Sequence, residues 1–432
     1  MNKRLSPILF TLILTFPLFG CTQTKGKESM SEKDTSISES KEDTSEHSEE
    51  SSSSEEEVLW GDEMHDFLPD VGETKLLFRH SLEETVGDDG EDYFYNYCPS
   101  IKIEDNVEHI YYCTNEEWGN VTDHIGYREG RIEDGLLKYS EESLVLSPTP
   151  DTWDRTHTCD PTVIKGEFKY NGETYNYLMA YLGCVPLNCK LNETGLAVAK
   201  DYNGPWIKCN GMKADGVTPI NPIVPYKDFD CNENNWGTGQ ACLVSIDKKG
   251  RVLLFTTVSC PTGGFTDIRE YDFSDINNYQ LIRETKLFKD GGCQFGTNWI
   301  GNAEYCYDHI NKKFLMSKPR GGYGKDGEYP DFIADHIDVY YVDVSSYENP
   351  FDIFFDTERT EEWHFFATID QELSGYPRNH NNGMVTDEYG HLYRDGYIGV
   401  AFTSSQYGTI SAMTYLKTYR IFLTTFKLPY KD

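Results

Sequence analysis

The residues that could do chemistry in this sequence stand at the starts of a weak internal repeat. Asp160 opens the stretch D-P-T-V-I-K, and Glu304 lies in N-A-E-Y-C-Y. A dense polar group near the last repeat contains Arg378, His380 and Asn382. Carboxylates, imidazoles and amides of this kind can exchange protons or bind polar ligands. Their shared place in the repeat predicts that they meet at one site.

Five segments of the repeat begin alike, roughly 60 to 80 residues apart, a spacing in the range of propeller repeats or somewhat longer. They read C-P-S-I-K-I from Cys98, D-P-T-V-I-K from Asp160, G-Q-A-C-L-V from Gly239, N-A-E-Y-C-Y from Asn302 and H-N-N-G-M-V from His380. Apolar or aromatic runs follow most of them, such as R-V-L-L-F-T-T, which turn residues bound on both sides.

These repeats predict an all-β chain that forms a five-bladed β-propeller, with the first strand of each blade at the axis. The 30 Tyr and 23 Phe and the scarcity of helical periodicity agree with strands. A large β-sandwich, or two of them, is the alternative. Val58 to Tyr97 could supply a closing strand for the last blade, or it could lie across one face.

Four successive segments of the chain share a pattern with a known family. They read C-D-P-T-V-I-K-G-E-F-K-Y-N-G-E-T-Y-N-Y-L-M-A-Y-L-G, G-L-A-V-A-K-D-Y-N-G-P-W-I-K, N-P-I-V-P and W-G-T-G-Q-A-C-L-V. They resemble glycoside hydrolase family 43 and its relatives, and the resemblance is good from about Asp160 to Thr257 and thin elsewhere. The resemblance implies a five-bladed propeller and an inverting hydrolase, in which two carboxyl groups hold a water between base and sugar.

The same resemblance implies roles for single residues. Asp160 matches the general base, and Glu304 stands in the place of the general acid. Relatives carry an acid-tuning Asp on the blade between them, where this chain offers Gln240; Asp267 could substitute from a loop. Relatives also often place a His near a hydrated central cation, which would make His380 the neighbour of a structural Ca²⁺ on the axis.

Each candidate also has a structural interpretation. An Asp before Pro commonly begins a turn, and Glu304 could join neighbouring blades by hydrogen bonds. His380 could plug the channel. Trp236, Trp299 and Tyr376 precede three of the starts and could stack on sugar faces or pack between blades. The acidic run Asp88–Asp92 lacks the spacing of a calcium loop and reads as a solvated turn.

The N-terminal residues are expected to form a targeting signal. Lys3 and Arg4 precede an apolar stretch that ends in L-F-G-C, which resembles the lipobox of bacterial lipoproteins, with Cys21 lipidated after cleavage. We expect residues 1–20 to be a signal peptide, residues 21–57 a Ser/Glu-rich disordered tether, and residues 58–432 the propeller. The protein is then expected on the extracellular face of a bacterial membrane, held by its lipid anchor.

The net charge limits the classes of binding partner, and the cysteine content indicates the redox compartment. The net charge of −33 disfavours nucleic acid and anionic lipid headgroups. Eleven cysteines remain without Cys21, which fits disulfides in an exported protein with at least one left unpaired. Cys184 and Cys189 could close a short loop, and the lack of C-x-x-C gives zinc no support.

These features favour a surface glycosidase that acts on a glycan or oligosaccharide as a monomer. Gln240, Trp236, Trp299, His380, Asn382 and Arg378 would bind the substrate around Asp160 and Glu304. A propeller that binds glycan without hydrolysing it is the second hypothesis, and a structural or adhesive surface protein is the third. P-loop, dinucleotide, H-E-x-x-H and G-x-S-x-G motifs are absent from the sequence, so the chemistry of those motifs has no support.

Overall fold

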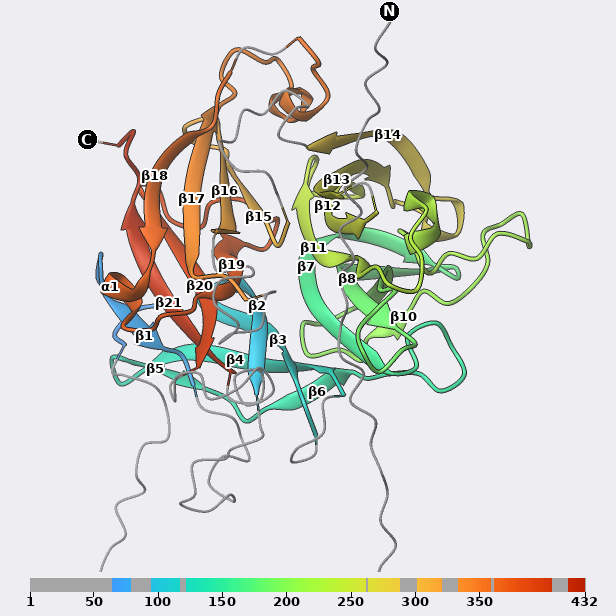
Figure 1. Cartoon of the computed structure of the whole chain (residues 1–432), viewed down its shortest axis with the longest axis horizontal. Helices are drawn as coiled ribbons and strands as arrows, with labels where there is room; N and C mark the ends of the chain where they lie inside the picture. The colour runs from blue at the N-terminus through green and yellow to red at the C-terminus, as the bar shows by residue number, and fades with distance from the viewer. Residues whose placement is uncertain are drawn as a thin grey trace, which may run out of the picture. The chain divides into compact units, whose positions relative to one another are not determined.

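The computed structural model describes residues 64–78, 95–116, 122–261, 263–287, 301–320, 333–358, 361–405 and 419–431. Within them the strands form five antiparallel meanders, which we number as blades 1 to 5, and blades 5 and 1 join in one nine-stranded sheet (Figure 1). Blade 1 contains β2 (Asn96–Glu104), β3 (Val107–Thr114), β4 (His124–Glu133), β5 (Leu136–Tyr139) and β6 (Ser143–Leu146). Blade 2 contains β7 (His157–Tyr170), β8 (Glu173–Cys184), β9 (Glu193–Ala199) and β10 (Ile207–Lys208).

The remaining blades repeat the same meander from the inner strand outward. Blade 3 contains β11 (Gly237–Ser245), β12 (Arg251–Cys260), β13 (Gly263–Asp272) and β14 (Gln280–Leu287). Blade 4 contains β15 (Glu304–Asp308), β16 (Lys313–Arg320), β17 (His336–Asp343) and β18 (His364–Ile369). Blade 5 contains β19 (His380–Asp387), β20 (Tyr397–Ser405), β21 (Tyr419–Lys427) and β1 (Thr74–Leu76). Short helices occupy some connections: η2 (Tyr226–Phe229), η3 (Ile276–Asn278), η4 (Pro350–Phe354) and α1 (Gln371–Ser374).

The first strands of the blades form a closed ring. Each inner strand contacts the inner strand of the next blade, in the order β2, β7, β11, β15, β19 and back to β2. The ring closes where β19 and β2 pair in parallel, with Val385 opposite Ile101 and Asp387 opposite Ile103. The prediction of a five-bladed propeller is therefore confirmed, and a β-sandwich is excluded.

Each blade packs against both of its neighbours, which explains why the predicted strands are apolar in continuous runs. In β12, Leu253 and Phe255 belong to the core shared with blade 4. The alternating residues Val252 and Leu254 belong to the core shared with blade 2. Since successive side chains of a strand point to opposite faces, a strand between two blades buries both of its faces.

A segment from before the first blade completes the last one. β1 pairs antiparallel with β21, with Thr74 opposite Thr424 and Leu76 opposite Phe422. Next to it, Leu77 and Phe78 are buried in the core between blades 5 and 1. This confirms that part of Val58 to Tyr97 supplies a closing strand, which protects the outer edge of blade 5.

Several predictions concern residues outside the described part. These are the signal peptide, Cys21 and the tether, as well as Asp88–Asp92 and Trp299. In the described part, the structure contains no helix long and apolar enough to cross a membrane.

Candidate functional site

Five residues at the blade starts share an uncommon backbone conformation. The φ angles are 50° at Cys98, 47° at Asp160, 47° at Gln240, 51° at Asn302 and 45° at Asn381. Few non-glycine residues adopt positive φ, and such residues gather at functional sites and irregular strand starts. In four of the five blades the strand register shifts at this residue, as a β-bulge does. We call these five residues the axial ring; they are the starts that the repeat predicted.

The axial ring borders a small cavity. Its lining consists of Cys98, Pro99, Asp160, Pro161, Gln240, Ala241, Asn302, Ala303, Glu304, Asn381 and Asn382. The cavity volume is about 30 Å³, enough for one or two waters and too small for a sugar ring. Gln240 Oε1 and Asn382 Oδ1 are buried without a hydrogen-bond partner among the described residues, so acceptors are available to a hydroxyl or water in this part of the molecule.

Asp160 is the carboxylate of the axial ring. Its side chain is buried, and burial raises its pKa from 3.8 to about 7. A hydrogen bond from the Cys98 thiol and one from the Gln240 backbone oppose this shift, whereas the charge of Asp123 adds to it. A carboxyl group with such a pKa is present in both protonation states near neutral pH, as acid/base catalysis requires.

Glu304 lines the same cavity but lies two residues further along its strand. Burial raises its pKa from 4.5 to about 7, against the opposing effects of the Lys102 charge and a hydrogen bond with Cys242. Lys102 itself donates to Thr386 Oγ1 at 2.7 Å. The two predicted catalytic carboxyls are thus brought to one cavity.

Asp160 of blade 2 and Glu304 of blade 4 do not occupy equivalent positions in their blades. The residue of blade 4 with the φ angle of Asp160 is Asn302, not Glu304. Glu304 is instead equivalent to Thr162 of blade 2, which follows Asp160 by two residues. The ring therefore has one carboxylate, and amides occupy its positions in blades 3, 4 and 5.

The members of the polar cluster at the start of blade 5 have different surroundings. Asn382 lines the cavity and donates to the Ser317 carbonyl at 3.0 Å. Arg378 is buried away from it, where it donates to the Ile333 carbonyl at 2.7 Å. The structure therefore does not bring Arg378 to the site, because its guanidinium links blades 4 and 5.

His380 is buried beside the ring. The backbone N–H of Ala334 donates to its Nδ1 at 3.3 Å, and its Nε2 lies 3.5 Å from Nδ2 of Asn302. Burial, followed by the charge of Arg378, lowers the pKa of His380 to about 3, so its imidazole is neutral. Among the described residues, the groups that could hold a metal do not include His380. Its contacts agree with the channel-plug interpretation.

The remaining candidates in the described part of the chain lie off the cavity. Trp236 is half-buried and packs against Cys98, Cys159 and their neighbours at the edge of the ring. Tyr376 packs in the core of blades 4 and 5, with its ring centroid 4.9 Å from that of Phe422. Asp267 lies in β13, the third strand of its blade, where Arg269 binds it at 2.7 Å, so the suggestion that it tunes the acid is wrong.

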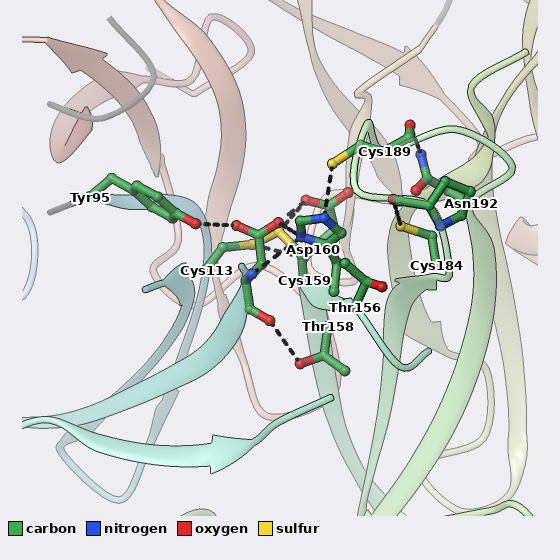
Figure 2. Close-up of polar contacts among 12 residues, drawn as sticks. Tyr95, Cys113, Thr156, Thr158, Cys159, Asp160, Cys184, Cys189 and Asn192 are labelled. Carbon is green, nitrogen blue, oxygen red and sulfur yellow. Dashed lines mark hydrogen bonds and ion pairs between the residues drawn. A yellow bond between two sulfur atoms is a disulfide. The ribbon is translucent and has the colours of Figure 1, made fainter. Parts of the chain in front are cut away.

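Sequence reasoning missed a network that lies beside Asp160 (Figure 2). A disulfide joins Cys113 to Cys159, and Oδ1 of Asp160 lies 3.2 Å from the sulfur of Cys159. Asp123 accepts from the Tyr95 hydroxyl at 2.7 Å and lies 2.8 Å from Nδ1 of His157. The sequence signal was H-T-C-D-P, since His157 and Cys159 precede the predicted base on one strand.

Comparisons with known proteins find similar solved structures only at low sequence identity. No family model matches the sequence, and no curated protein matches it. Among solved structures, the chain is similar to Zg3597, a family 117 glycoside hydrolase from the marine bacterium Zobellia galactanivorans, with 9% identity and a TM-score of 0.48 over 87% of this chain and 93% of that one.

Two further structures show the same kind of similarity. The α-L-arabinofuranosidase PaAbf62A from Podospora anserina is 10% identical, with a TM-score of 0.47 over 79% of this chain and 93% of that one. A thermostable family-43 glycoside hydrolase is 14% identical, with a TM-score of 0.44 over 78% and 91%. At these identities and TM-scores, fold and activity both have to be argued from the residues of this chain.

Proposed function

We propose that this protein is a glycoside hydrolase that acts on neutral glycans at the mouth of the axial cavity. One observation carries the proposal: Asp160 and Glu304 line the same cavity, and burial raises the pKa of both to about 7. An inverting hydrolase needs such a pair, one carboxyl to take a proton from water and one to give a proton to the leaving oxygen.

The size of the cavity agrees with one carboxyl activating a water and the other protonating the leaving oxygen. About 30 Å³ holds the attacking water but not a pyranose ring. The sugar would therefore lie outside the axial ring, and the amides of Gln240, Asn302 and Asn381 would face its hydroxyl groups. Asp160 would act as the base, and Glu304, kept partly protonated by burial, would act as the acid.

A second function is a propeller that binds glycan without cleaving it. The observation in its favour is that blade 4 has Asn302 at the position of the axial ring where blade 2 has Asp160. An amide can bind a hydroxyl group but cannot transfer a proton at neutral pH. In that case the ring would recognise sugar, and Glu304 would serve to balance the charge of Lys102.

Hydrolysis and binding assays on a panel of neutral polysaccharides test both functions. We expect turnover with inversion at the anomeric carbon, seen by NMR, and its loss in Asp160→Asn and Glu304→Gln with binding retained. Glu108→Gln is the matched control, because burial also raises the pKa of Glu108 to about 7 but Glu108 does not line the cavity. Binding without turnover across the panel would favour the binding propeller, and neither binding nor turnover would contradict both.

We further propose that the protein is anchored outside the cell by lipid on Cys21, since the L-F-G-C sequence follows an apolar stretch. Growth with labelled fatty acid should label the wild-type protein, and Cys21→Ser should release it or leave it unprocessed. An unlabelled wild-type protein would contradict this proposal.

A further inference from the structure

A histidine and two cysteines from different segments meet at the end of blade 2. His157 is the first residue of β7, and Cys184 is the last residue of β8, directly opposite it in the register. Cys189 lies in the loop between β8 and β9. The potential ligand atoms of these three residues all lie within 4.8 Å of one another. Figure 2 labels the two cysteines. We call them the His–Cys–Cys cluster.

The imidazole of His157 is oriented toward the sulfurs. Its Nδ1 lies 2.8 Å from Oδ2 of Asp123, and its Nε2 lies 3.6 Å from Sγ of Cys189. The backbone nitrogen of Asp123 also lies 3.3 Å from Nδ1, but the shorter contact with the carboxylate makes Nδ1 the donor. With Nδ1 so occupied, Nε2 is the nitrogen available to a metal.

The spacing matches a tetrahedral metal site. Zinc binds imidazole nitrogen at about 2.0–2.1 Å and thiolate sulfur at about 2.3 Å, which places N and S about 3.5 Å apart at the tetrahedral angle. The observed distance of 3.6 Å between Nε2 and Sγ differs from this by about a tenth of an ångström. Metal-bound histidines also commonly donate their second N–H to a carboxylate, as His157 does to Asp123.

The surroundings hold these groups in place. Asp123 is buried and fixed by the Tyr95 hydroxyl at 2.7 Å. The loop that carries Cys189 is held by its backbone N–H, which donates to the Pro186 carbonyl at 3.2 Å. Asn192 Nδ2 donates to the carbonyl of Cys189 at 3.0 Å. A site fixed by such secondary contacts loses little entropy when it binds a metal.

We propose that His157, Cys184 and Cys189 bind a zinc ion, with one coordination position left to water. Zinc fits because thiolate and imidazole are its preferred ligands. The metal would join the start of β7 to the end of β8 and fix Asp123, whose charge acts on Asp160. Binding displaces the protons of the two thiols, so zinc affinity falls as pH is lowered.

Two other uses of the cluster account for less of the geometry. A Cys189–His157–Asp123 triad would leave Cys184 without a role, although Cys184 forms a hydrogen bond with Cys189. That bond and burial raise the pKa of Cys189, which is the opposite of what an activated nucleophile needs. A disulfide between Cys184 and Cys189 would leave the orientation of His157 unexplained.

Zinc content of the purified full chain tests the proposal. After purification with reductant and zinc, and removal of unbound metal, we expect one zinc per chain by elemental analysis. His157→Gln, Cys184→Ser and Cys189→Ser should each abolish stoichiometric zinc, and Asp123→Asn should weaken zinc affinity about 10- to 100-fold. Cys209→Ser is the control, since Cys209 is a buried thiol in another core. Cobalt in place of zinc should give the visible bands of a tetrahedral site with thiolate ligands.

Three results would overturn the proposal. The first is wild-type protein without stoichiometric zinc although thiol titration finds Cys184 and Cys189 reduced. The second is a Cys184–Cys189 disulfide, found by peptide mapping, as the form present in freshly isolated cells. The third is full zinc retention in the Cys189→Ser variant together with rapid alkylation of Cys189 in the wild type, which would favour the nucleophile. The wild-type measurements decide the question even where a variant does not fold.

Discussion

Replacing Asp160 by Asn should change how the stability of this protein depends on pH. The folded state raises the pKa of this carboxyl from 3.8 to about 7, chiefly by burial. Between these two values the folded protein binds the proton more tightly than the unfolded chain does. The stability of the wild type therefore falls as pH rises from about 4 to about 7 and stays low above it.

The size of this effect follows from the shift. Each pKa unit corresponds to about 1.4 kcal/mol, so a shift of about three units amounts to about 4 kcal/mol. In the variant, an amide of the same shape does not titrate, so this position adds no pH dependence to the free energy of unfolding. The difference in unfolding free energy between Asp160→Asn and the wild type should thus grow by about 4 kcal/mol between about pH 4 and about pH 8, in favour of the variant.

Urea denaturation at a series of pH values measures this difference. Other buried carboxyls, such as Glu304 and Glu108, titrate in both proteins and cancel when the two are subtracted. Asp215→Asn is the control, because a hydrogen bond from Thr218 lowers the pKa of Asp215 to about 2, below the window measured. A difference curve for Asp160→Asn that stays flat from pH 4 to pH 8 would refute the claim that the folded state withholds water from this carboxyl.

Other positions give further predictions. Replacing Cys113 and Cys159 together by Ser should lower the free energy of unfolding by roughly 4 kcal/mol, from the loop entropy of a 46-residue separation; an unchanged urea midpoint would argue against this. Gly383→Ala should lower the melting temperature through a loss of about 1–3 kcal/mol or more, because its Cβ would lie 2.0 Å from the Pro99 carbonyl oxygen; wild-type melting would mean that β2 and β19 separate easily. Leu77→Ala should lose about 2–5 kcal/mol and speed amide exchange in β21, and unaltered exchange there would show that β1 closes the blade without this anchor.

The fold was predictable because each blade carries its own short signal. The starts at Cys98, Asp160, Gln240, Asn302 and Asn381 share a positive φ angle, so local sequence repeats wherever the backbone repeats. The apolar runs were readable as strands, since burial on both faces removes the polar alternation. The need to protect the last edge made a closing strand one of two interpretations of the segment before the first blade, and β1 shows that it is the correct one.

The site was harder to predict, because register decides which side chains share a level of the ring. Asn302 and Glu304 are separated by two residues, and only the φ angle shows which of them matches Asp160. The His–Cys–Cys cluster was missed for a similar reason. His157 and Cys184 meet because β7 and β8 pair in one register, whereas the search for C-x-x-C considers only neighbours in sequence.

The closing strand also makes the ring sensitive to mechanical force. β1 has three residues and pairs with β21 on that edge, next to a single bridge between Val71 and Thr425. Tension on the chain ahead of Met64 first loads two contacts of the segment before β1: the Leu137 backbone N–H donates to the Met64 carbonyl, and Arg394 pairs with Asp66. β1 is loaded next. A pull from that end would therefore detach the segment from Met64 through β1 and expose the edge of blade 5, while β19 and β2 still hold the ring together. The protein would yield to load in two steps, a weak one at the closing strand and a stronger one at the ring.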